Sequence, residues 1–249
     1  MAAHAARGAL ILRFVYPRTP PSRHAELMRD WSRKLLRILA VETLVEGPVP
    51  QWDGPVMIVA NHVSWLDIFV VASVRGTRFV AKREIRDWPV AGWIVEKAGT
   101  LFLTREARRD LARMGEQVHD ALAAHDCVGL FPEGTTTEGD QVLKFHGSLL
   151  EPAIRNGARV VPVALRYETP QGALCTHASF AGEITFMESF ARVIRERRIV
   201  ARLAFLDPVE SAGRERRELA QQLRGAIASR LERLRTEPRT RPGPRGGSR

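Results

Sequence analysis

The stretch Asn61-His62-Val63-Ser64-Trp65-Leu66-Asp67 directly follows the apolar run Val56-Met57-Ile58-Val59-Ala60. A short, continuous run of branched apolar residues is typical of a strand that is buried on both faces of a sheet. A second polar stretch, Phe131-Pro132-Glu133-Gly134-Thr135-Thr136-Thr137, follows the apolar run Val128-Gly129-Leu130. Both polar stretches are therefore predicted to begin where core strands end.

Strands and helices alternate along the rest of the chain. Beyond 56–60, the hydrophobic pattern predicts strands at 78–81, 101–103, 127–131, 159–165 and 199–205. It predicts helices at 68–74, 89–95, 106–124, 147–156 and 214–234. This alternation predicts an α/β fold with a mostly parallel central sheet flanked by helices, with sites outside the strand ends. Pro162 lacks a backbone N–H, which favours an edge or a strand end for its strand.

A helix with two distinct faces is predicted from Ser22 or Arg23 to about Ala40. Its apolar arc holds Leu27, Met28, Trp31, Leu35, Ile38 and Leu39, and the opposite side holds Arg29, Asp30, Arg33, Lys34 and Arg37. Leu36 falls outside the arc. A basic face opposite Trp and Leu is typical of a helix that lies in a membrane interface. Packing on the protein's own core is the commoner cause of such a pattern, and both interpretations stay open.

The 249 residues carry a formal net charge of +10, which favours an anionic partner such as a phospholipid surface, a nucleic acid or an acidic carrier. No helix-turn-helix, RNP-type or zinc-finger motif is present, so we expect no nucleic-acid partner. Two cysteines, Cys127 and Cys175, and seven scattered histidines form no metal-ligand pattern, so we expect no metal.

The longest N-terminal apolar run, Gly8 to Tyr16, is interrupted by Arg13. A transmembrane helix needs about 20 apolar residues, so we expect no membrane span. No small-residue cleavage site follows, so we expect no signal peptide either. These features predict a peripheral protein on the cytoplasmic face of the membrane.

His62 and Asp67, five residues apart across a turn, form a candidate base and orienting group. The carboxylate can accept a hydrogen bond from one ring nitrogen, which leaves the other nitrogen to take a proton. Taken singly, the pair also fits a structural histidine and a helix-capping aspartate. Ser64 makes a serine hydrolase an alternative, although no G-x-S-x-G elbow surrounds it. In the other mechanism His62 deprotonates a hydroxyl of the substrate itself.

The second polar stretch places a carboxylate, a glycine and a hydroxyl at Glu133, Gly134 and Thr135. Glycine allows a backbone N–H to approach an anion closely. Arg105 follows the predicted strand 101–103 and can clamp a phosphate with two hydrogen bonds. Each feature alone also fits an ordinary turn or a surface arginine, but three polar groups at successive strand ends indicate a site.

Four motifs in order carry a resemblance to a known family. They are NHxSxxD at Asn61, His62, Ser64 and Asp67, a G-x-I-F-I-x-R-like segment from Gly99 to Arg105, FPEGT at Phe131 to Thr135, and a V-P-V-like strand from Val160 to Ala164. Together they resemble the PlsC-like glycerolipid acyltransferases, the lysophosphatidate (1-acylglycerol-3-phosphate) acyltransferase family. The resemblance covers about Val56 to Ala164, and the N-terminal helix resembles the membrane-binding helices of bacterial members.

The resemblance implies that a fatty acyl group passes from an acyl thioester, on CoA or acyl carrier protein, to the free hydroxyl of a lysolipid. His62 would act as the general base, and Asp67 would orient it. The acceptor head group would be bound by Arg105, Glu133, Gly134 and Thr135. No cofactor beyond the acyl thioester co-substrate is implied.

Thr136 departs from the family pattern, because many members have Arg after the third motif's threonine. The change removes one cation near the expected phosphate site, although Lys82, Arg83 or Lys144 can compensate. Lysophosphatidate, which would give phosphatidate in phospholipid biosynthesis, is therefore the first expected acceptor. Another lysolipid, such as lyso-ornithine lipid, is the alternative. A non-catalytic membrane-binding protein is the alternative of a different class, against which the complete His62–Asp67 pair argues.

The domain organisation expected from these features has three parts. Residues 1–50 would form an N-terminal helical segment that associates with the membrane, and residues 51–235 an acyltransferase catalytic domain. Residues 236–249 are rich in Arg, Pro and Gly and are predicted to form a disordered basic tail.

Overall fold

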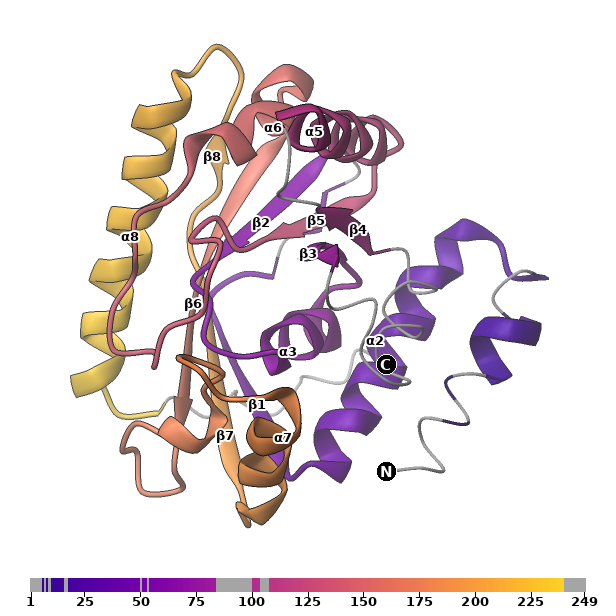
Figure 1. Cartoon of the computed structure of the whole chain (residues 1–249). Coiled ribbons are helices and arrows are strands. Elements are labelled where there is room, and N and C mark those ends of the chain that lie inside the picture. The colour runs from indigo at the N-terminus through magenta and orange to yellow at the C-terminus, as the bar shows by residue number, and fades with distance from the viewer. Residues whose placement is uncertain are drawn as a thin grey trace, which may run out of the picture.

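A mostly parallel sheet runs through the protein, with helices on both faces (Figure 1). The computed structural model describes residues 6, 8, 10–15, 18–49, 51–52, 54–83, 100–103 and 108–239. Within them, the sheet has eight strands in the order β1-β7-β6-β2-β5-β3-β4, and β8 pairs with β6. The strands are β1 Val41–Glu46, β2 Val56–Ala60, β3 Arg78–Lys82, β4 Leu101–Leu103, β5 Cys127–Leu130, β6 Arg159–Glu168, β7 Ile199–Phe205 and β8 Val209–Glu210.

Helices fill the connections between the strands. They are η1 Ile11–Val15, α2 Pro21–Ile38, α3 Leu66–Val74, α5 Arg108–Ala123, η4 Gly147–Leu150, α6 Glu151–Asn156, η5 Thr176–Ala178, α7 Phe186–Arg195 and α8 Arg216–Thr236. The predicted α/β class and mostly parallel sheet are confirmed. The helix predicted at 89–95 lies outside the described residues. None of the described helices is long and apolar enough to cross a membrane.

The core is divided by the sheet into two apolar layers. One layer contains α3 and the inner sides of α2 and α7, and the other contains α5, α6 and α8. Figure 1 shows α8 on the opposite side of the sheet from α2, α3 and α7. The strand β2 is buried along its whole length because side chains of both its faces enter these layers.

The helix α2 packs on the core through Leu35, Leu36 and Leu39, which are all buried. The ring of Trp31 lies 5.7 Å from that of Phe69 on α3. Leu36, which the predicted arc leaves out, is buried, whereas Ile38 within the arc is 41% exposed. Core packing therefore accounts for much of the apolar face of α2, and membrane binding by this segment stays a prediction.

The sequence pattern does not predict β1, β8 or α7. Only Val41 and Leu44 of the six residues in β1 are buried, so the strand lacks the alternation that marks a half-buried strand. It pairs in parallel with β7, from Val41 opposite Ile199 to Glu46 opposite Ala204. This pairing joins part of the segment 1–50 to the same sheet as the residues that follow it.

The prediction that Pro162 marks an edge or a strand end is wrong. β6 lies inside the sheet, between β2 and β7. The carbonyl of Pro162 accepts from Leu206 N at 3.0 Å, just beyond the end of β7, and β8 pairs only at residues 159 and 160. A residue in a strand points its N and O to the same side, so the missing N–H of Pro162 faces the gap between β7 and β8.

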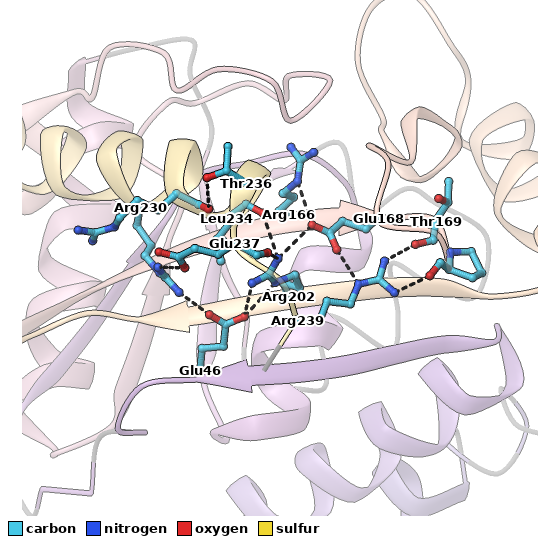
Figure 2. A network of polar contacts seen from close by, with 12 residues as sticks. Glu46, Arg166, Glu168, Thr169, Arg202, Arg230, Leu234, Thr236, Glu237 and Arg239 are labelled. Atoms are coloured by element: carbon cyan, nitrogen blue, oxygen red, sulfur yellow. Dashed lines mark hydrogen bonds and ion pairs between the residues drawn. The ribbon is translucent and has the colours of Figure 1, made fainter. Parts of the chain in front are cut away.

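A network of buried ion pairs joins the end of α8 to the sheet (Figure 2). Arg202 on β7 donates from Nε to Glu46 of β1 at 2.9 Å and from Nη1 to the carbonyl of Glu237 at 3.2 Å. Arg239 donates from Nε to Glu168, at the end of β6, at 2.9 Å. Arg202 and Glu168 are almost completely buried, and removing one partner of such a pair is strongly destabilising.

The first residues of the predicted disordered tail are therefore ordered. Residues 236–239 lie against the sheet, where Glu237 also accepts from Arg230 at 2.6 Å. The sequence did not reveal this because Glu237 contacts Arg202, 35 positions earlier, and Arg239 contacts Glu168, 71 positions earlier. Residues 240–249 lie outside the described residues.

Candidate active site

The polar stretches of the sequence meet at one edge of the sheet. β2 pairs in parallel with β5 and with β6, so the carboxyl ends of these three strands lie together. His62 follows β2, Glu133 follows β5, and Tyr167 lies near the end of β6. In open α/β sheets this is the edge at which ligands bind.

His62 and Asp67 form the predicted pair. His62 Nδ1 lies 2.7 Å from Asp67 Oδ2. The same carboxylate oxygen accepts the backbone N–H groups of Val63 at 2.8 Å and Ser64 at 3.0 Å. Asp67 is the second residue of α3, and its side chain is completely buried. The turn between β2 and α3 thus folds around this carboxylate.

The contacts of Asp67 assign the histidine tautomer. The backbone N–H groups of Val63 and Ser64 and the Tyr167 hydroxyl all donate to its two oxygens, so the carboxylate is an acceptor in each of these contacts. His62 Nδ1 therefore carries a hydrogen, and Nε2 is left with a lone pair. The His62 side chain is 22% exposed, so the site has room to admit a substrate at this ring. The geometry suits a general base.

Tyr167 is a site residue that the sequence analysis missed. Its hydroxyl donates to Asp67 Oδ1 at 2.8 Å, and its side chain is 1% exposed. Burial, together with the charge of Asp67, raises the pKa of Tyr167 well above the ordinary value for tyrosine. The phenol therefore stays protonated and remains a donor. No local signal marks Tyr167, because its partner is 100 residues away in the chain.

Stacked rings hold the imidazole in place. The rings of His62 and Phe131 lie 4.2 Å apart and nearly parallel, and Phe131 stacks in turn on Phe79 of β3 at 5.6 Å. A Cβ on Gly129 would lie only 2.5 Å from the Phe79 ring, so this glycine makes room for the stack. The apolar run before the second motif thus also supports His62.

Glu133 connects the two motifs. Oε1 accepts the backbone N–H of His62 at 2.8 Å, and Oε2 accepts that of Leu143 at 2.8 Å. Burial raises the pKa of Glu133, against the lowering effect of these two donors. Both oxygens are directed at the protein itself, which indicates a positioning role. The predicted contact of Glu133 with the acceptor head group stays a prediction.

The turn after Glu133 faces the same edge of the sheet. Gly134 has a positive φ of 68°, a conformation that glycine adopts without strain, and Thr135 is exposed. Thr136 donates its hydroxyl to the carbonyl of Phe180. Thr137 N donates to the carbonyl of His62 at 2.9 Å. Gly134 and Thr135 are thus close to the His62 loop, as the prediction requires, and their binding role stays untested.

Arg105, the remaining predicted site residue, lies outside the described residues. The strand β4 before it pairs in parallel with β3, which pairs in parallel with β5. β4 therefore ends at the edge of the sheet where β2 and β5 end.

Ser64 is not arranged as a nucleophile. Its side chain is completely buried, and its Oγ accepts the backbone N–H of Leu66 at 3.3 Å. The side chains of Ser64 and His62, both of which the structure describes, form no hydrogen bond with each other. Ser64 thus caps the start of α3, and the geometry disfavours the serine hydrolase alternative. No cluster of three or more potential metal ligands occurs among the described residues.

The chain is similar to known proteins over most of its length. The family model described as Acyltransferase matches residues 41–166. The lyso-ornithine lipid O-acyltransferase of Pseudomonas aeruginosa is 38% identical over 204 residues, which cover 81% of this chain and 76% of that protein. The 1-acyl-sn-glycerol-3-phosphate acyltransferase of Neisseria meningitidis serogroup B is 34% identical over 198 residues, which cover 80% and 77%.

A solved structure has the same fold. It is the 1-acyl-sn-glycerophosphate acyltransferase PlsC from Thermotoga maritima, with a TM-score of 0.67 at 21% identity over 94% of this chain and 95% of that chain. The resemblance found in the four motifs is thereby confirmed. The chain belongs to the PlsC-like acyltransferase family and is an O-acyltransferase of the 1-acylglycerol-3-phosphate type.

Proposed function

We propose that this enzyme transfers a fatty acyl group from an acyl thioester to the free hydroxyl of a lysolipid. The observation that carries the proposal is the His62–Asp67 pair, with Nδ1 at 2.7 Å from the carboxylate and, among the residues that the structure describes, no nucleophilic side chain bonded to the ring. A base without a partner nucleophile fits direct transfer to a hydroxyl of the substrate. The donor is an acyl-CoA or an acyl carrier protein thioester.

The reaction follows from the assigned tautomer. His62 Nε2 takes the proton of the lysolipid hydroxyl as its oxygen attacks the thioester carbonyl. The imidazolium that forms is stabilised by the Asp67 carboxylate, which accepts four hydrogen bonds. The tetrahedral intermediate then collapses, the C–S bond breaks, and the thiolate leaves with the proton from Nε2. The products are an ester and a free thiol.

Lyso-ornithine lipid is the acceptor that we propose first, with lysophosphatidate second. This order reverses the expectation from the sequence. Two observations support it: the 38% identity to a lyso-ornithine lipid O-acyltransferase, and Thr136. The Thr136 hydroxyl is directed at the Phe180 carbonyl, beside the His62 loop, where many family members carry an arginine. A site with one cation fewer suits a zwitterionic head group better than a phosphate monoester.

We further propose that the enzyme binds the cytoplasmic face of the membrane as a peripheral protein. Leu10, Phe14 and Val15 near the N-terminus are 58%, 54% and 45% exposed. Arg13 lies over the ring of Phe14, at 5.6 Å from its centroid. Exposed apolar side chains next to cations suit an anionic lipid surface, to which each nearby basic residue contributes about 1 kcal/mol.

One assay tests the reaction and the acceptor together. Purified protein is offered lyso-ornithine lipid or lysophosphatidate, each with acyl-CoA or acyl carrier protein thioester, and the esterified product is measured. We expect transfer to lyso-ornithine lipid to be faster, and His62→Ala to abolish it. His177→Ala is the control, because His177 also contacts a carboxylate, Glu196, but is exposed and belongs to none of the motifs. Transfer to neither acceptor would refute the proposal.

A further inference from the structure

The helix α7, which the sequence motifs do not include, is attached directly to the catalytic loop. Trp65, between His62 and Asp67, donates from Nε1 to Ser189 Oγ at 3.1 Å. Its ring also packs against Phe186 at 5.4 Å and Phe190 at 6.2 Å. One side of α7 is therefore fixed to the loop that carries the general base.

The core covers only part of the apolar side of α7. The apolar residues of α7 cover roughly 160° of the helix, since successive residues are roughly 100° apart. They are Phe186, Met187, Phe190, Ala191, Val193 and Ile194. Ser189 and Val193 are completely buried, whereas Met187 is 66% exposed and Ile194 is 53% exposed. The exposed side chains of Met187 and Ile194 thus form an apolar strip along the outer side of the helix.

A third exposed apolar residue, Ile38, lies at the edge of the sheet where β1 and β7 begin. α2 leads into β1 and α7 leads into β7, and these two strands pair in parallel from their first residues. Ile199 N donates to the carbonyl of Ala40 at 2.9 Å, so the two helix ends are neighbours. Ile38, at the end of α2, is 41% exposed. We call Ile38, Met187 and Ile194 the α7 face.

The charges around the α7 face are mixed, and its arginines reach solvent. Arg192, Arg195 and Arg197 are exposed. Arg195 and Arg197 form no ion pair with any residue in the described part of the chain. Three acidic residues lie nearby: Glu183 is exposed, Glu188 caps α7 through Thr185, and Glu196 contacts His177. Exposed apolar side chains beside Arg195 and Arg197 suit an anionic, apolar partner.

We infer that the α7 face docks on a bilayer that contains anionic lipid. β7 runs antiparallel to β6, so α7 lies at the edge where β6 ends, beside the site of the catalytic pair. A bilayer at this face would supply the lysolipid next to His62. The delivery of lysolipid to His62 rests on the proposed function. Docking on the bilayer can be measured without any acyl transfer.

The test measures binding of the full chain to vesicles of phosphatidylglycerol and phosphatidylcholine by co-sedimentation. The variant Met187→Glu with Ile194→Glu is expected to bind about tenfold more weakly, because two charges replace apolar contact. The control is Gln221→Glu with Ser229→Glu, which adds the same charge on exposed positions of α8, across the sheet. Unchanged binding in the α7 variant, or equal loss in the control, would overturn the inference.

A fluorescent label at position 187 distinguishes docking of the α7 face from attachment through the N-terminal residues. The native cysteines Cys127 and Cys175 are buried, so Met187→Cys can be labelled selectively with an environment-sensitive fluorophore. The emission of this label is expected to shift to the blue when vesicles are added. The emission of a label at Gln221→Cys is expected to stay unchanged. No shift at position 187 would contradict the inference whether or not the enzyme turns over.

Two further measurements exclude other occupants of the α7 face. If it were covered by a second copy of this chain, light scattering would show a dimer that Met187→Glu with Ile194→Glu dissociates. If it bound an acidic carrier protein, the variant would lose carrier binding and keep vesicle binding. Either result would overturn the inference. Should the Glu variant fail to fold by circular dichroism, Met187→Ser with Ile194→Ser replaces it.

Discussion

The hydroxyl of Tyr167 donates to Oδ1 of Asp67 at 2.8 Å, inside the core and behind the catalytic pair. Asp67 Oδ2 accepts from His62 Nδ1 and two backbone N–H groups, so the tyrosine is the donor that satisfies the other oxygen. A buried carboxylate with an unpaired oxygen is strongly disfavoured. Tyr167 therefore positions Asp67 and sets how strongly it attracts the proton of His62.

Tyr167→Phe is expected to shift the pH dependence of transfer. Without the phenol hydrogen bond, the negative charge of Asp67 is less neutralised, so Asp67 stabilises the imidazolium of His62 more strongly. The acid limb of kcat/KM against pH should therefore move to higher pH. A slower variant with an unmoved acid limb would show that Tyr167 has only a structural role.

The stability of the protein at alkaline pH should also depend on Tyr167. Its pKa is raised in the folded state, so above about pH 10 the unfolded chain loses this proton while the folded chain keeps it. The free energy of unfolding should therefore fall with rising pH, by at most about 1.4 kcal/mol per pH unit from this group. Urea unfolding of Tyr167→Phe from pH 9 to 11 should show a shallower fall than the native chain. Equal slopes would contradict the assignment.

Glu133→Gln should lower kcat more than it changes KM. The amide NH2 cannot accept a hydrogen bond, so either the His62 N–H or the Leu143 N–H loses its acceptor, and the loop of the general base shifts. We expect a loss of kcat of about tenfold or more. Glu138→Gln, at an exposed position of the same loop, serves as the control. A large rise of KM with unchanged kcat would instead support direct binding of the head group by Glu133.

His62→Ala and Ser64→Ala should differ sharply. His62→Ala removes the base, and we expect activity to fall by about 100-fold or more. Ser64→Ala removes only a cap of α3, so it should lower the free energy of unfolding by about 1 kcal/mol and keep substantial transfer activity. Product formation and urea unfolding measure the two effects. Equal loss of activity in both variants would favour a serine nucleophile.

Glu168→Gln should destabilise the whole fold. Glu168 contacts Arg166 at 3.1 Å, Arg202 at 3.4 Å and Arg239 at 2.9 Å, and it is almost completely buried (Figure 2). Removing its charge leaves buried guanidinium groups without compensation, which costs about 3–5 kcal/mol. Urea unfolding measures the loss, with Glu232→Gln on the exposed side of α8 as the control. A loss below about 1 kcal/mol would mean that the network contributes little.

The local signals of the sequence were sufficient for most of the architecture. The strands β2, β5, β6 and β7 and the helices α3, α5 and α8 follow from continuous or periodic apolar runs, which depend on near neighbours in the chain. The strand β1 and the helix α7 were missed because each has only part of its surface in the core. The prediction for Pro162 was wrong because the gap between β7 and β8 is created by chain 40 residues later.

The sequence by itself determined the family and the pairing of His62 with Asp67, because both depend on residue types at fixed short spacings. Only the tertiary structure showed that Tyr167 completes the shell of Asp67, and that both oxygens of Glu133 face backbone N–H groups. It also showed that α7 is fixed to Trp65. These contacts join residues between 10 and 124 positions apart. Hydrogen bonds over such separations are created when parallel strands bring distant loops to one edge, and no local pattern records them.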